Sequence, residues 1–168
     1  MTGTSGRWWL THDSREVVIE APAAAIYELV ADMPRMGEWS PECQRVEWLN
    51  GSTGPAVGST FVGHNKGGPR KLMKWSRQGR VLTAEPGHEF AFVTEEGGRP
   101  STEWRYEFEQ LAGGTRVVES YDVKWIPLWA RILDVPTNRA AELRAAMDHT
   151  LDRLKVAAEA VEAPNGHL

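Results

Sequence analysis

Cysteine is nearly absent from this sequence, which holds one among its 168 residues. A lone Cys43 excludes an internal disulfide and a thiolate metal site. The histidines are scattered and form no His-Glu-x-x-His pattern, and the glycines lack the spacing of phosphate- or dinucleotide-binding loops. No Gly-x-Ser-x-Gly turn surrounds a serine nucleophile. We therefore expect no metal and no cofactor, and no catalytic motif is self-evident.

Long apolar runs are also missing. No stretch approaches the roughly 18 consecutive apolar residues that a membrane-spanning helix needs. The first residues lack the charged start and apolar run of a secretory signal. With 41% hydrophobic and 25% charged residues, the composition is typical of a soluble globular protein. These features predict a cytoplasmic protein without stable membrane insertion, and they leave the oligomeric state open.

The chain has no excess of positive charge, since 23 acidic residues outnumber 19 basic ones. A net charge of −4 gives phosphate backbones no general attraction, so we expect no nucleic-acid partner. The exception is residues 66–80, which carry lysine and arginine but no acid. Ion pairing with the acidic residues of 85–109 on neighbouring strands explains this polarity more simply than a nucleic-acid groove.

Turn residues divide the first three quarters of the chain into short elements. Residues 1–14 are predicted to form a polar N-terminal arm, followed by a strand over 16–20 because polar and apolar residues alternate there. A short helix begins at Ala21-Pro22 and ends before Pro34. Six further strands are predicted, separated by glycine-rich turns: 43–49, 59–65, 70–77 with an extension to 85 left open, 88–95, 101–110 and 115–125.

The last segment has the periodicity of a long amphipathic helix, from Ala140 to Val161. An apolar connection over 125–136, interrupted by prolines, precedes it, and 163–168 is predicted to be a frayed tail. No linker or repeat divides residues 1–168, so we expect one α+β domain with an antiparallel sheet covered by helices on one face. Curling of the sheet around the long helix would leave room for a ligand cavity.

Short motifs along the chain resemble those of a known superfamily. They are Asp32-Met33-Pro34, Trp39-Ser40-Pro41, Gly58–Phe61, Trp75, Glu85-Pro86, Trp104–Glu109 and Gly113–Val117. In this order they are similar to the START-related helix-grip superfamily (SRPBCC), in its polyketide cyclase/dehydrase-like branch, over about residues 15–160. The resemblance implies a single START-like domain whose seven-stranded, curved antiparallel sheet wraps around the C-terminal helix, with a short helical segment after the first strand. It also implies a hydrophobic cavity between sheet and helix.

One motif carries a more specific expectation. Val118-Glu119-Ser120-Tyr121 resembles the last strand of the plant abscisic-acid receptors, in which the glutamate faces the hormone. The gate-loop motifs of those receptors have no counterpart here, so receptor function is not implied. Alternation places Glu119 on the same strand face as Val117 and Tyr121, which predicts an inward carboxyl with a raised pKa and a hydrogen-bond partner. The alternative is a bulge that turns Glu119 outward to solvent.

The predicted cavity lies between aromatic side chains of the sheet and one face of the long helix. Its predicted lining is Phe61, Trp75, Phe90, Phe92, Trp104, Tyr106, Glu119, Tyr121, Leu143, Met147, Thr150 and Leu151. Segments 37–41 and 125–135 are predicted to flank its mouth, with Trp39, Trp125 and Trp129. Aromatic rings that simply fill the interior are the alternative.

Three functions follow from these features, and the favoured one is non-catalytic. We expect the protein to bind or carry a hydrophobic small molecule, lipid- or polyketide-like, in the internal cavity. The alternative is a cofactor-independent polyketide cyclase, aromatase or dehydratase, with Glu119, Tyr106 and Tyr121 as candidate catalytic groups. An interaction or regulatory module that uses the basic stretch and the apolar connection ranks third.

Overall fold

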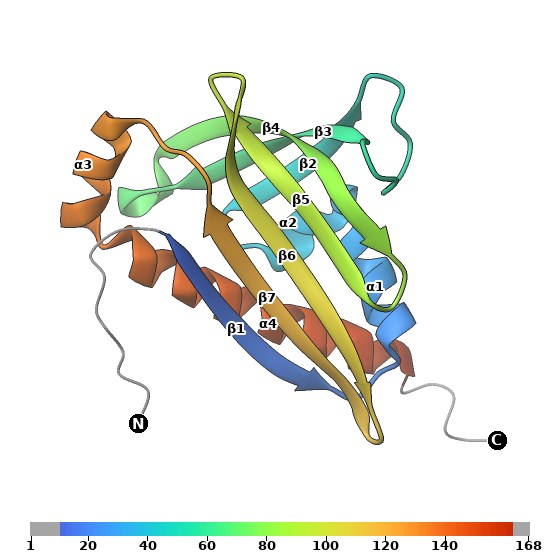
Figure 1. Ribbon diagram of the computed structural model, residues 1–168. Coiled ribbons are helices and arrows are strands. Elements are labelled where there is room, and N and C mark those ends of the chain that lie inside the picture. The colour runs from blue at the N-terminus through green and yellow to red at the C-terminus, as the bar shows by residue number, and fades with distance from the viewer. Residues whose placement is uncertain (1–10, 163–168) are drawn as a thin grey trace.

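The computed structural model describes residues 11–162 and shows a seven-stranded antiparallel sheet curved around a long C-terminal helix (Figure 1). The elements in chain order are β1 (His12–Ile19), α1 (Ala23–Ala31), a 3-10 turn (Met33–Arg35), α2 (Met36–Trp39), β2 (Cys43–Leu49), β3 (Thr60–Gly67), a second 3-10 turn (Pro69–Lys71), β4 (Met73–Glu85), β5 (Glu89–Glu96), β6 (Arg99–Leu111), β7 (Gly114–Val123), α3 (Leu128–Thr137) and α4 (Arg139–Glu162). The predicted helix-grip fold is confirmed.

Strands β2 to β7 form a meander, because each pairs with its neighbour in sequence. The sheet order is β1-β7-β6-β5-β4-β3-β2, so β1 closes one edge by pairing antiparallel with β7. Tight turns fix the registers: Gly97 and Gly98 both have positive φ between β5 and β6, the conformation that two-residue hairpin loops require. The register of β6 with β7 places Tyr106 directly opposite Glu119.

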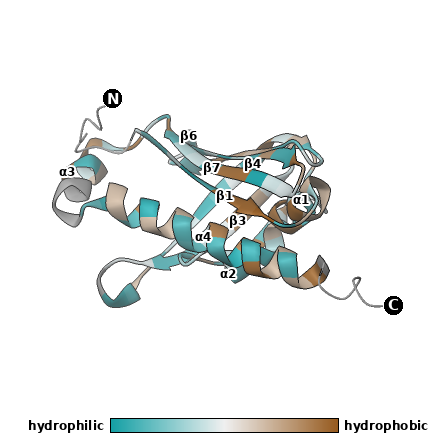
Figure 2. Cartoon of the chain, turned by 90° about the horizontal axis from the view of Figure 1, so that it is seen from below, coloured by the Kyte–Doolittle hydropathy of each residue, from teal (hydrophilic) through white to brown (hydrophobic). Residues whose placement is uncertain are grey.

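Helices α1, α2 and α4 lie on the concave face of the sheet, whereas α3 extends beyond it at the end where α4 begins (Figure 1). Figure 2, which views the molecule from below, shows α4 running along this side. The buried stripe of α4 includes Leu143, Met147, Leu151 and Leu154, which recur at three- and four-residue spacing. Helix α1 covers the end of the sheet where α4 ends, and there Tyr27 packs edge-on against aromatic rings of β5 and β6. Apolar burial on this one face stabilises the fold.

The starts of two predicted strands need correction. Strand β1 begins at His12 rather than residue 16, so the end of the predicted arm 1–14 is strand paired with β7. The predicted strand 70–77 begins at Met73 and does extend to Glu85, as the open alternative allowed. Residues 1–10 of the arm and the tail 163–168 lie outside the described residues.

The connection over 125–136 was predicted without helix, and this was wrong. It contains α3, whose first turn is closed by hydrogen bonds from the backbone N–H groups of Ala130 and Arg131 to the carbonyl of Pro127. A proline at the start of a helix lacks only an N–H that would have no helical partner. The prolines that suggested a break therefore mark the beginning and the last turn of a helix.

Candidate functional site

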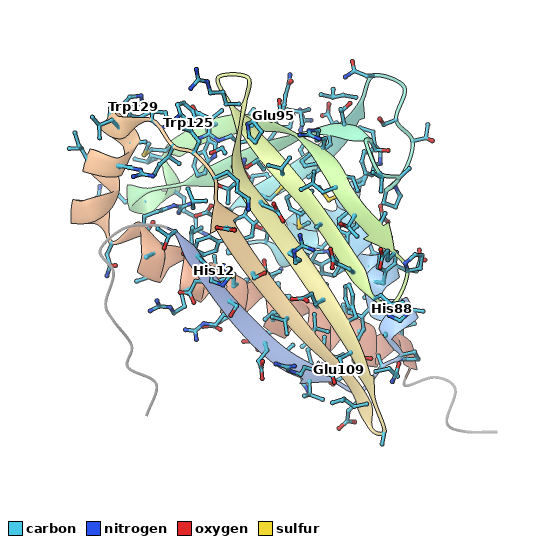
Figure 3. The ribbon with its side chains drawn as sticks, in the orientation of Figure 1. His12, His88, Glu95, Glu109, Trp125 and Trp129 are labelled. Carbon is cyan, nitrogen blue, oxygen red and sulfur yellow. The ribbon has the colours of Figure 1, made fainter. Side chains whose placement is uncertain are left out.

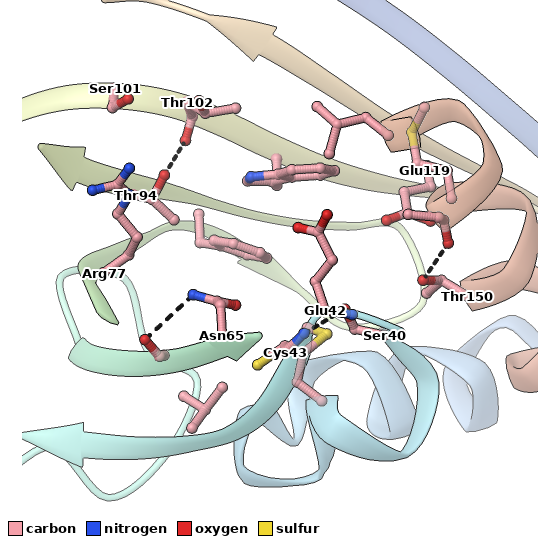
Figure 4. Close-up of a pocket in the computed structure, with 18 of the residues that line it drawn as sticks. Ser40, Glu42, Cys43, Asn65, Arg77, Thr94, Ser101, Thr102, Glu119 and Thr150 are labelled. Carbon is pink, nitrogen blue, oxygen red and sulfur yellow. Dashed lines mark hydrogen bonds between the residues drawn. The ribbon is translucent and has the colours of Figure 1, made fainter. Parts of the chain in front are cut away.

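A cavity of about 290 Å³ lies between the sheet and the first half of α4 (Figure 4). Nine of the predicted cavity residues line it: Phe61, Trp75, Phe92, Trp104, Tyr106, Glu119, Leu143, Met147 and Thr150. Three others, Phe90, Tyr121 and Leu151, are packed in the core beside it. Rings that fill the interior and rings that border a cavity therefore coexist in this protein.

Two glycines shape the cavity wall. Gly63 occupies an inward position of β3 between Phe61 and Asn65, and a Cβ built there would have only the Arg77 carbonyl oxygen nearby, at 3.9 Å. Its missing side chain leaves space inside the sheet. Gly79 on β4 has the opposite role, since a Cβ there would lie 2.5 Å from the Phe61 ring. Glycine at position 79 therefore lets the Phe61 ring lie flat against the sheet as part of the wall.

The carboxyl of Glu119 is the most deeply buried acid in the described part of the chain, with only 3% of the residue exposed. Tyr106 donates a hydrogen bond from its hydroxyl to Glu119 Oε1 at 2.8 Å. The other oxygen, Oε2, is buried without a hydrogen-bond partner among the described residues. The inward orientation predicted for Glu119 is observed, and its role in binding stays a prediction.

Burial is the main cause of the raised pKa values of Glu119 and Tyr106. Loss of hydration raises the pKa of Glu119 to about 8, and the nearby Asp148 charge adds to this, while the Tyr106 hydrogen bond acts in the opposite direction. Burial and the adjacent Glu119 also raise the pKa of Tyr106. At neutral pH both groups are therefore protonated. Because Tyr106 already donates to Oε1, the Glu119 proton resides on the unpartnered Oε2 and is available to an acceptor in the cavity.

The remaining polar groups lie toward the strand ends and the start of α4. Arg77 of β4 forms an ion pair with Glu96 of β5, and burial lowers the pKa of Arg77. Arg139, the first residue of α4, forms an ion pair with Glu42, which precedes β2. One of its hydrogen bonds joins Nη2 to Glu42 Oε2 at 2.8 Å. The cavity thus combines an apolar body, one inner carboxyl and a polar, charged rim.

Cys43 lines the cavity but has the properties of a structural thiol. Burial raises its pKa to about 11, so the thiol stays protonated near neutral pH. Its Sγ lies 3.7 Å from the Arg45 carbonyl oxygen, to which it donates a weak hydrogen bond. A neutral, buried thiol is a poor nucleophile.

The three tryptophans predicted at the mouth do not line the cavity themselves. Trp39 is buried in the core, and the Arg35 guanidinium lies over its ring at 5.1 Å. Trp125 lies under Arg99, and Trp129 on α3 is 63% exposed (Figure 3). Their neighbours do line the cavity: Ser40, Ile126 and Ala130. The two predicted segments border the cavity through these smaller residues.

Several residues that line the cavity were not predicted from the sequence. Asn65 and Arg77 have the same strand parity as Phe61 and Trp75, so the alternation rule could have identified them. Thr94, Thr102 and Val123 likewise share the parity of predicted lining residues on β5, β6 and β7. The remaining lining residues come from segments that strand parity does not relate to the predicted lining: Met33, Met36, Glu42, Val46, Ser101, Arg139 and Ala146.

Two features are absent from residues 11–162: a metal-binding cluster and a membrane-spanning helix. No three histidine, cysteine, aspartate or glutamate side chains gather there in a way that could hold a metal ion. No helix in that part of the chain has the length and apolar composition needed to cross a bilayer.

A curved sheet that encloses a helix and a cavity defines a helix-grip protein with an internal pocket. Residues 11–159 match the family model described as polyketide cyclase / dehydrase and lipid transport, and the chain belongs to this family. This confirms the resemblance drawn from the sequence motifs. Among curated proteins, no sequence matches this chain.

Solved structures show the same fold. The Polyketide_cyc-like protein Cgl2372 from Corynebacterium glutamicum is 28% identical, with a TM-score of 0.59 over 94% of this chain and 96% of that chain. Protein CV1439 from Chromobacterium violaceum is 16% identical, with a TM-score of 0.65 over 89% of this chain and 99% of that one. The di-domain aromatase/cyclase StfQ of the steffimycin biosynthetic pathway is 12% identical, with a TM-score of 0.72 over 94% of this chain and 53% of that one.

Proposed function

We propose that this protein binds a hydrophobic small molecule in the cavity and holds a hydrogen-bond acceptor of that molecule, such as a ketone oxygen, at Glu119. The observation that carries the proposal is the buried Oε2 of Glu119, which lacks a partner beside an apolar cavity. An unsatisfied buried polar group costs about 1–3 kcal/mol. A ligand that accepts a hydrogen bond from this group recovers that cost and becomes oriented.

The walls favour an apolar ligand body. Phe61, Phe92, Trp104, Leu143 and Met147 supply aromatic and aliphatic surface, and methionine adapts to irregular shapes. The volume is near the lower end of small-molecule pockets, which span roughly 300–1,000 Å³. A few polar groups among apolar walls are the usual arrangement for fixing the orientation of such a ligand. Lipid-like and polyketide-like molecules combine an apolar body with carbonyl oxygens, and the family description names both classes.

The proposal is tested by filling the cavity. The probe is a naphthyl ketone whose fluorescence shifts to the blue in apolar surroundings, titrated with purified protein. Gly63→Leu adds a side chain inside the cavity where the backbone leaves room, so uptake should fall at least tenfold. The matched control is Gly54→Leu, because a Cβ at position 54 meets nothing within 4 Å and Gly54 lies in the loop between β2 and β3.

Native mass spectrometry of protein purified from its own host adds the identity of the natural ligand. A retained apolar molecule with a carbonyl group supports the proposal. Equal probe uptake by Gly63→Leu, Gly54→Leu and the unchanged protein would place the probe elsewhere on the molecule and contradict it. Circular dichroism of both variants establishes that each remains folded.

A catalytic role for the same site is the second candidate function. The feature that favours it is a buried acid whose pKa of about 8 suits proton transfer near neutral pH. In a cyclisation, neutral Glu119 would donate its proton to a ketone oxygen while an enol carbon of the same ligand attacks the ketone carbon. The enol hydroxyl becomes a ketone and releases its proton to water, from which the Glu119 carboxylate regains a proton for the next turnover. Tyr106 would hold the resulting carboxylate through its existing hydrogen bond.

Glu119→Gln separates the two functions. Glutamine retains an N–H donor at the same place but carries no transferable acid proton, so it should hold an acceptor ligand at neutral pH. A binder predicts ligand uptake and no product with the original protein. An enzyme predicts product with the original protein, and uptake without product in Glu119→Gln, when polyketide mimics are followed by mass spectrometry.

A further inference from the structure

Two segments beside the cavity expose large apolar side chains. The β3–β4 hairpin carries Leu72 and Met73, which are 77% and 60% exposed. Helix α3 carries Leu128, Trp129 and Ile132, which are 74%, 63% and 65% exposed. Exposed apolar residues that cluster, unlike single ones, mark a surface with a partner. We call these two segments together, residues 66–74 and 128–132, the hairpin–α3 surface.

The hairpin–α3 surface is located at one end of the molecule. Both segments lie at the end where α4 begins, as Figures 1 and 2 show from two directions. Residues in or next to these segments line the cavity: Trp75 and Arg77 follow the hairpin on β4, Ile126 precedes α3, and Ala130 lies in its first turn. The exposed apolar side chains therefore flank the end of the molecule at which the cavity has its charged rim.

Positive charge accompanies the apolar side chains. The hairpin residues 66–74 hold no acid and four basic residues, Lys66, Arg70, Lys71 and Lys74, in a chain whose net charge is −4. Lys66 and Lys74 are directly opposite each other in the β3–β4 register, an unfavourable pairing of like charges that an anionic partner would relieve. At the hairpin tip, Arg70 and Lys71 both have positive φ, which is an uncommon backbone conformation for residues other than glycine. Arg131 adds an exposed basic side chain on α3.

We propose that the hairpin–α3 surface docks the protein on an anionic phospholipid bilayer, with the charged rim of the cavity toward the membrane. Leucine, methionine, isoleucine and tryptophan enter the headgroup region, where tryptophan is favoured, while lysine and arginine pair with lipid phosphates. Two separate projections that bear the same chemistry are suited to a flat surface. The apolar side chains distinguish this surface from a nucleic-acid groove, in which leucine and isoleucine have no general partner. The inference goes beyond the proposed function, because docking does not require an occupied cavity.

Co-sedimentation with vesicles tests the docking. Vesicles of phosphatidylcholine and phosphatidylglycerol in equal parts should retain the protein, whereas pure phosphatidylcholine should retain it at least tenfold less, and added salt should weaken the retention. The double variant Leu72→Ser/Met73→Ser and the double variant Trp129→Ser/Ile132→Ser should each reduce the partition coefficient by about tenfold or more. The matched control is Val57→Ser/Val156→Ser, since these valines are 68% and 71% exposed outside the surface.

A second pair of variants tests the contribution of positive charge to vesicle binding. Arg70→Gln/Lys71→Gln should reduce the partition coefficient by about tenfold or more, because each basic residue near an anionic surface contributes to binding. Arg80→Gln/Arg116→Gln lowers the net charge equally at two residues outside the surface and should have a much smaller effect. Equal losses in the two charge variants, or equal retention by both kinds of vesicle, would contradict docking through this surface.

Two further measurements distinguish membrane docking from dimerisation through the same surface and from ligand binding in the cavity. Light scattering after size exclusion reports the oligomeric state: dimerisation that Leu72→Ser/Met73→Ser abolishes would show that the surface joins two copies, and the bilayer proposal would then be wrong. The Gly63→Leu variant should bind anionic vesicles as the original protein does. Lost probe uptake with intact vesicle binding in Gly63→Leu is the result that both proposals predict. Unchanged uptake by this variant would contradict only the cavity proposal, and failure of the original protein to bind anionic vesicles would contradict only the docking proposal.

Discussion

The two halves of α4 face different interiors. Toward its C-terminal end, Leu151, Leu154 and Ala158 pack in a continuous core with α1 and the aromatic residues of β5 and β6. Toward its N-terminal end, Leu143 and Met147 border a cavity. One apolar stripe on one helix therefore meets a filled interior at one end and an open interior at the other.

What differs is the side chains that the sheet and α1 bring to each half. At the filled end, Tyr27 of α1 packs edge-on against Phe90 and Phe108, with ring centroids 6.1 Å and 6.0 Å away. At the open end the sheet presents Gly63 and Thr94, which are too small to reach across to α4. Amphipathic periodicity alone thus establishes which face of a helix is buried, and the opposing residues decide whether a cavity remains.

Truncation of one leucine in each half of α4 should give the largest difference in stability between the filled end and the open end. Leu154→Ala removes a fully buried side chain from the filled end and should lower the free energy of unfolding by about 3–4 kcal/mol, because a new cavity forms. Leu143→Ala enlarges a space that already exists and should cost about 1–2 kcal/mol. Urea denaturation measures both. Equal costs would show that the interior is filled at both ends.

The pH dependence of stability isolates Glu119. Its pKa is about 8 in the folded protein and near 4.5 when exposed, so the folded state binds the extra proton between these values. Its contribution to stability is complete below about pH 4.5 and is lost as pH rises through about 8. Glu119→Gln should therefore match the original protein near about pH 5 and exceed it by a few kcal/mol near about pH 9. A constant difference across this range would contradict the buried neutral acid.

Removal of the Tyr106 hydroxyl should have a smaller effect. Tyr106→Phe deletes the hydrogen bond donated to Glu119 Oε1 and should cost about 1–2 kcal/mol near neutral pH. Because that hydrogen bond holds the pKa of Glu119 down, the loss of stability with rising pH should continue to a higher pH in the variant than in the original protein. A stability–pH curve displaced to lower pH would oppose this assignment.

Filling the open end should change stability least. Gly63→Leu should alter the free energy of unfolding by less than about 1 kcal/mol, since the new side chain enters existing space. Gly79→Ala is the contrasting case, because its Cβ would lie 2.6 Å from the Val93 carbonyl oxygen and 2.5 Å from the Phe61 ring. Thermal unfolding compares the two. A large loss in Gly63→Leu would mean that the cavity is unable to admit a side chain.

Local patterns predicted much of this architecture. Turn residues delimited the predicted strand 43–49, whose bounds are those of β2, and the three- and four-residue spacing of apolar residues located α4. Strand parity also placed Glu119 inward, since β7 runs without a bulge opposite β6. These features depend on residues close in sequence, which is why they could be read from it.

Features that depend on distant segments could not be predicted in this way. The ion pair between Arg139 and Glu42 joins residues almost a hundred positions apart, and neither residue has an unusual local context. The prediction that Phe90 and Leu151 border the cavity had the correct face but the wrong position along it, because α1 fills that end. Helix α3 was missed because its prolines suggest a break. Pro127 precedes the first helical residue, where proline is tolerated, but Pro136 lies in the last turn, where local sequence rules disfavour it.

The most direct test of the neutral, donating Glu119 is the affinity for the naphthyl ketone between about pH 6 and about pH 10, measured by fluorescence for the original protein and Glu119→Gln. We predict that the affinity of the original protein falls at least tenfold as pH rises through about 8, because the carboxylate loses its proton and repels the ketone oxygen. The affinity of Glu119→Gln should stay constant over the same range. A flat profile for the original protein, or the same decline in both proteins, would contradict the account.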